Sequence, residues 1–581
     1  MIFVLMSWIY ISLLIFAPGY ALSEAMKRIC RTDSSFELPL PLILINGLFV
    51  SAITALYFGL FYKVGLGAHL FLMVLSGCCY FFFNKGIWTA FRRYRAGIRS
   101  QPWFIWVFFI VILLVQCYAS YLPSSHNDDG LYFSTSIKWV QEYGTIPGLA
   151  NINPRIGFNS SWLILQAIFG FPFLHAGLFN DMNGLLFLYV FLIFLSGLRR
   201  FCQGERSLFA FMRVFFFLPI LFLNDSANTE WVFFNLNFFS SPSPDIPACL
   251  LTWLLLLLFV QPDQEQAGGT RLNQFLIMMY GGWLLTIKLS SVAVTLLMLY
   301  IIISWIRRRN WKTIAAICAC LLLTIVPWCT RTLLLTGYPI FPLPVTDWFS
   351  FDWKMPLHHV QWHKQAVKVY AIDNSLDLSK PFQQSLTTWF PGWFERLPYI
   401  HAVLMLFIGA GTIGFFVLLL VRILRRGKSY LYQNRQWLTV TVCCIAGIAF
   451  WLLNGPDMRL GVGFCLFFVM LGISWVCRYL LQDYVPVAAR ILLAILAVLI
   501  FNSYGSFLNG IVNHLFVRPL TPRVATRILE ERDMGHGVKL RLVDYTDSWN
   551  TPLPCAPLNE INALSPVLRG NTLRQGFRAR Q

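Results

Sequence analysis

Apolar runs long enough to cross a lipid bilayer recur along almost the whole sequence, and they leave few alternatives for the fold. Each crossing needs roughly 20 residues, and about fourteen such runs are separated by polar loops. Apolar residues make up 57% of the chain and charged residues only 12%, which is unlike the composition of a soluble domain. The sequence therefore predicts an all-α polytopic integral membrane protein.

The basic residues behind the formal net charge of +19 fall in short runs between the apolar segments. Short runs of this kind are typical of cytoplasmic loops, so the charge indicates topology and predicts no nucleic-acid partner. The fourteen cysteines show no CxxC spacing, so neither a zinc site nor a disulfide framework is expected. Five basic clusters are assigned to the cytoplasm: 27–31, 92–99, 199–206, 307–312 and 422–428.

Alternation between these clusters places the loops that are poor in positive runs on the opposite side. Two apolar runs, 162–174 and 184–198, occur where one crossing is needed, and the shorter first run is expected to be interfacial or re-entrant. Residues 337–399 are aromatic and far longer than an ordinary loop, which predicts short interfacial helices that cap a cavity.

The expected domains follow from this topology. Residues 1–100 would be an N-terminal transmembrane extension of about 3 spans, and residues 101–510 a core of about 11 spans. The core would carry two external loops, 123–182 and 337–399, and residues 511–581 would form an extracytoplasmic tail.

The acidic pair Asp128 and Asp129 follows directly on the apolar run 103–122, so it is expected at the membrane surface. On a helix, neighbouring side chains diverge by about 100°, so one carboxylate would be central. It would act as a general base towards an acceptor hydroxyl, or would hold a divalent cation, Mg²⁺ or Mn²⁺, that neutralises a phosphate leaving group. A solvated helix cap is the competing interpretation.

Four further charged residues lie near the same predicted surface. Lys288 and Arg331 are near the outer ends of apolar runs, and Arg459 follows Asp457 in a short turn. Such cations pair with phosphate oxygens, although Lys288 would also snorkel and Arg459 would also pair locally with Asp457. Asp245 precedes another apolar run, where capping that helix is an equally good explanation.

Two loops add polar candidates for contact with a substrate. Arg155 and Asn159 lie in a segment whose amides would suit sugar hydroxyls, or which is a plain structured connector. His358, His359 and His363 lack an acidic partner of the HExxH type, so His358 is expected to be a surface or substrate-contact residue, not a metal ligand.

Several of these segments together resemble the GT-C superfamily of polytopic glycosyltransferases over roughly residues 100–480. The segments are 129–132, 142–144, 155–161, 287–290 and 456–459. The resemblance implies a polyprenyl-phosphate-linked sugar donor, a glycan or lipid acceptor, and a site facing the periplasm or cell exterior from a bacterial cytoplasmic membrane. By position, Asp129 matches the catalytic acidic residue of the first large external loop, with Asp128 as its neighbour. The superfamily usually places that loop after its first helix, whereas three candidate spans precede it here.

The leading hypothesis from the sequence is therefore an inverting glycosyl transfer. Asp129 would be the base or the metal anchor, while Lys288, Arg331 and Arg459 would hold the departing phosphate. Two alternatives stay open, a polymerase or ligase of a lipid-linked surface polysaccharide and a non-enzymatic transporter or flippase.

Overall fold

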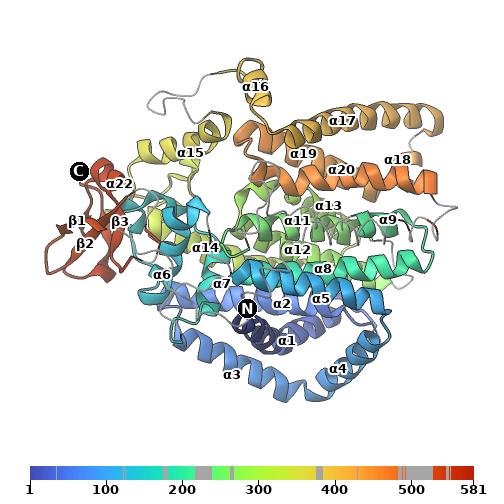
Figure 1. Cartoon of the computed structure of the whole chain (residues 1–581), viewed down its shortest axis with the longest axis horizontal. Helices are drawn as coiled ribbons and strands as arrows, with labels where there is room; N and C mark the ends of the chain where they lie inside the picture. The colour runs from blue at the N-terminus through green and yellow to red at the C-terminus, as the bar shows by residue number, and fades with distance from the viewer. Residues whose placement is uncertain are drawn as a thin grey trace.

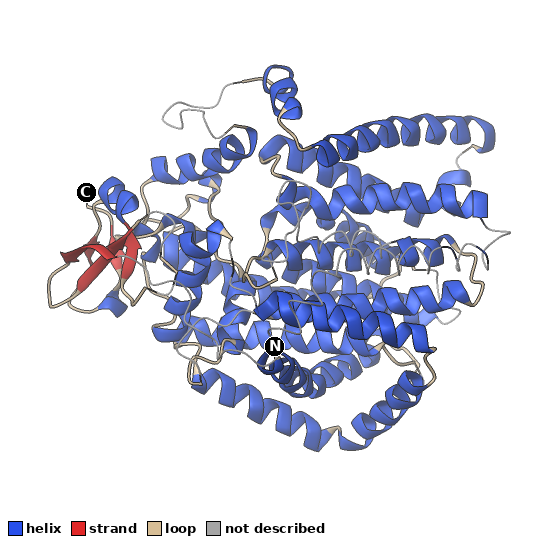
Figure 2. Ribbon diagram, viewed as in Figure 1, coloured by secondary structure: helices blue, strands red, loops and turns tan. Residues whose placement is uncertain are grey.

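The protein is a bundle of long helices with a small β-structure at one end, as the computed structural model shows (Figures 1 and 2). The structure describes residues 1–33, 36–121, 126–174, 181–215, 239–261, 267–373, 384–427, 429–481, 528–544 and 551–580, with a few isolated positions besides. Among these residues, nine helical segments are long and apolar enough to cross a membrane, or ten if the bent pair α3 and α4 counts as one span. The predicted polytopic helical membrane protein is thus confirmed, while apolar runs within 216–238 and 482–527 lie outside the described residues.

The nine long segments supply the body of the bundle. They are α1 (Ile2–Cys30), α2 (Leu40–Phe61), α5 (Trp103–Tyr121), α8 (Met182–Cys202), η5 with α13 (Leu289–Val294 and Thr295–Arg307), α14 (Trp311–Thr336), α17 (Tyr399–Arg426), α19 (Arg435–Asn454) and α20 (Met458–Leu481).

The other helices, all but the 21-residue α12 shorter than these segments, connect them or pack between them. They are α3 (Leu66–Phe82), α4 (Asn84–Arg99), η1 (Asp129–Phe133), α6 (Ser134–Glu142), η2 (Leu149–Asn151), η3 (Pro154–Phe158), α7 (Ser161–Phe169), α9 (Leu208–Phe215), α11 (Asp245–Val260), α12 (Ala267–Ile287), η6 (Pro344–Thr346), α15 (Leu357–Ile372), α16 (Leu386–Glu395), α18 (Ser429–Gln433), α22 (Leu558–Leu564) and η7 (Leu573–Gln575).

Helices α1 and α2, in the first hundred residues, pack directly against α12, α14 and α8. The crossing of α1 and α2 is close enough that a Cβ on Gly19 would lie 2.0 Å from the Ile43 carbonyl oxygen. A side chain at this position would force the helices apart, which explains the small residue at this crossing. Ser7 of α1 also donates a 2.8 Å hydrogen bond to the buried carboxylate of Asp181, next to the start of α8.

The run 162–174 does not span the bundle. Helix α7 has 9 residues, so it is about 13 Å long and well short of the hydrocarbon thickness. All of its residues are buried, and it packs against α2 and α6. It therefore lies inside the protein, which disagrees with an interfacial helix and leaves the re-entrant alternative open.

The two ends of the bundle differ in chemistry. Basic residues lie in the last turns of α4, α8, α13 and α17, at one end of the bundle. Helices α6 and α15 and the C-terminal strands lie at the opposite end (Figure 1). This arrangement agrees with the alternation deduced from the basic clusters. Helices α15 and α16 occur in the loop 337–399, as predicted.

The C-terminal segment folds into strands that were not predicted. β1 (Ile528–Asp533) pairs antiparallel with β2 (Lys539–Val543), which pairs parallel with β3 (Cys555–Pro557); β4 (Val567–Leu568) and β5 (Phe577–Arg578) form a second, antiparallel pair. Leu540 and Leu542 face the same side of β2 and join one buried cluster with Trp139, Ile146 and other residues of 139–156. The described part of the tail is thus docked on residues 139–156 through a shared apolar core.

Candidate functional site

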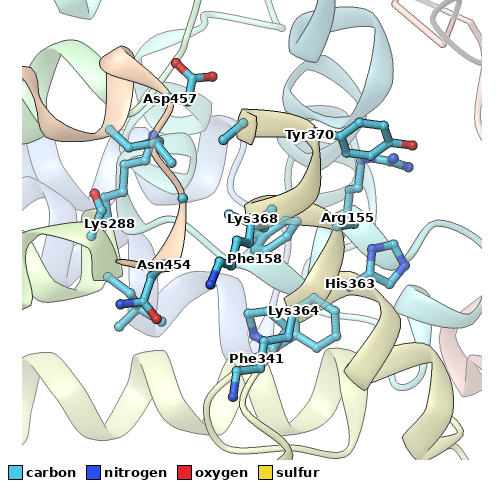
Figure 3. A pocket seen from close by; sticks show the side chains of 18 of the residues that line it. Arg155, Phe158, Lys288, Phe341, His363, Lys364, Lys368, Tyr370, Asn454 and Asp457 are labelled. Atoms are coloured by element: carbon cyan, nitrogen blue, oxygen red, sulfur yellow. The ribbon is translucent and has the colours of Figure 1, made fainter. Parts of the chain in front are cut away.

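A cavity of about 1030 Å³ lies at the end of the bundle that is opposite the basic clusters. Its walls come from the η1 and η3 region, the 287–290 and 341–344 segments, α15, and the turn between α19 and α20. Five of the residues singled out in the sequence line it (Figure 3 shows part of the lining). They are Asp128, Arg155, Asp245, Lys288 and Arg459.

Asp128 is the carboxylate of the acidic pair that reaches this cavity. Its Oδ2 atom lies 3.2 Å from Nη1 of Arg459, and the side chain is 25% exposed. Arg459 is held from the other side by Asp457, with 2.9 Å between the Arg459 Nε and the Asp457 carboxylate. The predicted local pair of Arg459 and Asp457 is therefore present, and it also orients Arg459 towards Asp128.

His126 completes this polar cluster. Its Nδ1 accepts a 3.1 Å hydrogen bond from the backbone N–H of Asp128, and its Nε2 lies 3.2 Å from Arg459 Nη1. Burial lowers the pKa of His126 to about 4, and the charge of Arg459 acts in the same direction. The ring is thus neutral at physiological pH and fixes the backbone that presents Asp128.

Asp457 keeps its charge despite its position in the cluster. Burial by itself would raise the pKa of this carboxyl, but the charge of Arg459 and its hydrogen bonds outweigh burial and hold the pKa below its usual value. One guanidinium is therefore matched by two carboxylates at this wall.

Lys288 and Asp245 form the second ion pair of the cavity. Lys288 lies between α12 and η5, and Asp245 is in the first turn of α11, where a carboxylate also suits the positive end of the helix dipole. The side chain of Asp245 is 2% exposed and that of Lys288 20%. Lys288 is therefore not a snorkelling side chain, and its charge is already balanced by Asp245.

The opposite wall carries cations of α15 that sequence reasoning did not select. Lys364 and Lys368 are one helical turn apart, and Figure 3 shows both extending from α15 on the side where Lys288, Asn454 and Asp457 lie. Among the described residues, Lys364 has no acidic partner. Their spacing is a signal in the sequence, but the prediction of short interfacial helices for 337–399 rests on the aromatic residues of this segment and not on its lysines.

Arg155 lines the cavity and is anchored from outside it. Its Nη1 donates a 2.6 Å hydrogen bond to Glu560 of α22, and both side chains are about 10% exposed. His363, the buried member of the histidine group, lies beside it on α15, where burial lowers its pKa to about 3. The C-terminal segment thus contributes to the wall of the cavity through Glu560.

The remaining predicted site residues lie elsewhere. Asp129 is fully buried and accepts a 2.5 Å hydrogen bond from Ser241 Oγ, and it does not line the cavity. Arg331 and Asn159 contact each other inside the protein, where Asn159 Nδ2 also donates to the Trp328 carbonyl at 2.9 Å, so they join η3 to α14. His358 is an exposed residue at the start of α15, with its ring tilted against that of His359, and it does not line the cavity.

One of the roles that the sequence predicts for the central carboxylate is to hold a divalent cation. In the described part of the chain, no group of three or more His, Cys, Asp or Glu side chains is placed to hold a metal ion. The cavity carboxylates Asp128, Asp245 and Asp457 instead each contact a lysine or arginine. The residues present do not fit a metal site, so no step below is assigned to one.

Comparison with known proteins identifies a family for this chain but no activity. No curated protein and no solved structure matches it. The model of one family, described as a domain of unknown function (DUF8201), matches residues 1–466. This range includes every residue named above that lines the cavity. Glu560, which contacts Arg155 from outside the cavity, lies beyond it. The chain belongs to the DUF8201 family.

Proposed function

We propose that this protein is a membrane glycosyltransferase that transfers a sugar from a polyprenyl-phosphate-linked donor to a glycan or lipid acceptor. The transfer would take place at the outer face of a bacterial cytoplasmic membrane. One observation carries the proposal. A single cavity at the end of an apolar bundle contains a carboxylate together with more cations than carboxylates. Five lysine and arginine residues and three aspartates line this cavity.

The charges divide the cavity into two unlike walls. On one wall, Asp128, Asp245 and Asp457 face Lys288 and Arg459, so carboxylates outnumber cations. On the other wall, Lys364 and Lys368 add positive charge beside the pair of Arg155 and Glu560. A phosphate is attracted to the second wall, where Lys364 has no acidic partner among the described residues, because the cations of the first wall are already balanced by carboxylates.

The chemistry follows from this division. Asp128 Oδ2 accepts the proton of the acceptor hydroxyl while the hydroxyl oxygen forms a bond to the anomeric carbon of the donor. The bond from that carbon to the phosphate oxygen breaks, and the electron pair leaves with the phosphate. Lys364 and Lys368 neutralise the developing charge of the phosphate, which is the kind of fixed electrostatic contribution that lowers a barrier strongly. Attack opposite the leaving group inverts the anomeric centre.

This proposal changes the roles expected from the sequence. We assign the base to Asp128 in place of Asp129, because Asp128 lines the cavity and Asp129 is buried against Ser241. Arg459 becomes a positioning residue for Asp128, and the phosphate contacts pass from Lys288, Arg331 and Arg459 to the lysines of α15.

The test is the surface glycan profile of a deletion strain of the source bacterium, complemented with wild type, Asp128→Asn or Glu395→Gln at matched membrane abundance. Glu395 ends α16 and does not line the cavity, so it is the matched carboxylate control. Loss of a defined glycan with Asp128→Asn alone supports the proposal. An unchanged profile in the deletion strain itself would remove it, and a shift only in chain length would favour a polymerase.

A further inference from the structure

Helix α4 presents an exposed cationic and aromatic surface at the end of the bundle opposite the cavity. Only Ile87 and Ala90 are buried among its residues. The side chains of Trp88, Phe91 and Ile98 are 62%, 48% and 41% exposed, although a soluble surface rarely leaves such groups together in water. Arg92, Arg95 and Arg99 are exposed on the same helix.

The basic residues and the tryptophan form one stripe. At about 100° per residue, Trp88, Arg92, Arg95 and Arg99 fall within roughly 60° of the helix circumference. Phe91 and Ile98 border this stripe and lie between it and the buried face of Ile87. The result is an apolar strip next to a basic strip along the whole helix, which is typical of helices that lie in a membrane interface.

The orientation of α4 fits the same surface. It is bent by 88° from α3, whose outer face exposes Leu66, Leu70, Phe71 and Val74. Figure 1 shows the two helices as an angled arm on the outside of the bundle, with α4 leading to α5. If α3 follows the direction of the spans, α4 runs along the plane of the bilayer at the end that carries the other basic clusters.

One arginine of α4 is already occupied. Arg93 Nη1 contacts Glu37 at 2.5 Å, and Tyr94 donates a 2.7 Å hydrogen bond to the Leu38 carbonyl, so this side of α4 is fixed to the protein. Within the described residues, Arg92, Arg95 and Arg99 have no acidic partner. Three exposed guanidinium groups that the described residues leave unmatched are thus available to an external anion.

We infer that α4 binds the headgroups of anionic phospholipids through Arg92, Arg95 and Arg99, while Trp88, Phe91 and Ile98 enter the boundary between headgroups and acyl chains. Arginine forks match phosphate oxygens, and an anionic leaflet attracts basic segments held at its surface. The occupant is the bilayer itself, because the exposed residues are apolar and basic in adjoining strips. This inference does not depend on the proposed enzymatic activity.

The experiment compares hydrogen exchange of peptides from residues 84–99 in the full chain, embedded in nanodiscs of phosphatidylcholine alone or with phosphatidylglycerol added. Wild type is expected to exchange roughly tenfold more slowly with phosphatidylglycerol, and Arg92→Gln/Arg95→Gln/Arg99→Gln should lose this difference. Arg93→Gln is the matched control and should keep it, since Glu37 already occupies Arg93.

Salt provides a second measurement that needs no variant. Raising the ionic strength should reduce the effect of phosphatidylglycerol on wild type, because the attraction is electrostatic. Equal exchange of wild type in both lipids, or a lipid effect that persists in the triple variant or in high salt, would overturn the inference.

Discussion

Asp128 and Arg459 are 331 positions apart in the chain, and their side chains meet at 3.2 Å in the wall of the cavity. The contact joins the residue before η1 to the start of α20. Both residues line the cavity, so the contact connects two segments of its wall that are far apart in the sequence. Neither residue is free of other partners, since Arg459 also contacts Asp457 and His126. The position of the proposed base is therefore set by a network and not by one ion pair.

Substitution of Arg459 tests the positioning role. Arg459→Lys keeps a cation but cannot contact Asp457, Asp128 and His126 together, because lysine lacks the planar fork of donors. We expect the rate of transfer to fall roughly tenfold to a hundredfold, with little change in the apparent affinity for the donor. Steady-state kinetics on the full chain in nanodiscs check this. A change confined to donor affinity would instead make Arg459 a phosphate contact.

Substitution of the α15 lysines tests the assignment of the phosphate wall. Lys364→Gln/Lys368→Gln removes two cations that line the cavity, and binding of a polyprenyl phosphate should weaken roughly 10²- to 10⁴-fold, since hydrogen bonds to charged groups contribute about 1.5–3 kcal/mol each. Isothermal titration with the protein in detergent measures the dissociation constant. Lys312→Gln, in the first turn of α14 and outside the cavity, is the matched control and should bind as wild type.

The pair of Arg155 and Glu560 predicts a structural role for the C-terminal segment. Because both side chains are about 10% exposed, Glu560→Ala removes the carboxylate that contacts a largely buried guanidinium, at a cost of up to about 3–5 kcal/mol. We expect limited proteolysis to release fragments of the segment after residue 528 more rapidly. Arg569→Gln breaks an exposed contact to Asp352 and should cost no more than about 1 kcal/mol. Equal cleavage of both variants would contradict this role.

Acid should destabilise the cluster around His126. Its pKa in the folded protein is about 4, below the ordinary value of 6.5, so the unfolded chain binds the proton first as the pH falls. The contribution of His126 is fully present above pH 6.5 and is progressively lost towards pH 4, about 2 kcal/mol of it by pH 5. Thermal unfolding of wild type and His126→Asn at pH 7 and pH 5 isolates this group. The wild type should lose more stability than the variant.

The amino-acid pattern predicts the membrane fold well because long apolar runs and basic clusters act locally. The end of the bundle that holds Asp128, Lys288 and Arg459 follows from their alternation alone. The sequence does not decide between Asp128 and Asp129, because the side chains of neighbouring residues differ only in their direction. Contacts with distant residues set these directions: Ser241 binds Asp129, and Arg459 binds Asp128. The partners of Arg155 and Lys288 depend in the same way on long-range packing.

The strands after residue 528 were missed for a related reason. They are between 2 and 6 residues long, and β2 is stabilised by burying Leu540 and Leu542 against Trp139 and other residues of 139–156. A short strand whose apolar partners lie about 400 positions away has little periodicity of its own. Hydropathy likewise gives no signal for the close crossing of α1 and α2, where Gly19 approaches Ile43.

The most direct test of the proposed transfer is mass spectrometry of lipid extracts from the deletion strain complemented with wild type, Asp128→Asn or Glu395→Gln. A glycosyltransferase that loses its base leaves its donor unused. The account predicts that an intact polyprenyl-phosphate-linked sugar accumulates in the deletion strain and with Asp128→Asn, and returns to its normal level with wild type and Glu395→Gln. The same level of every lipid-linked sugar in all strains would contradict it.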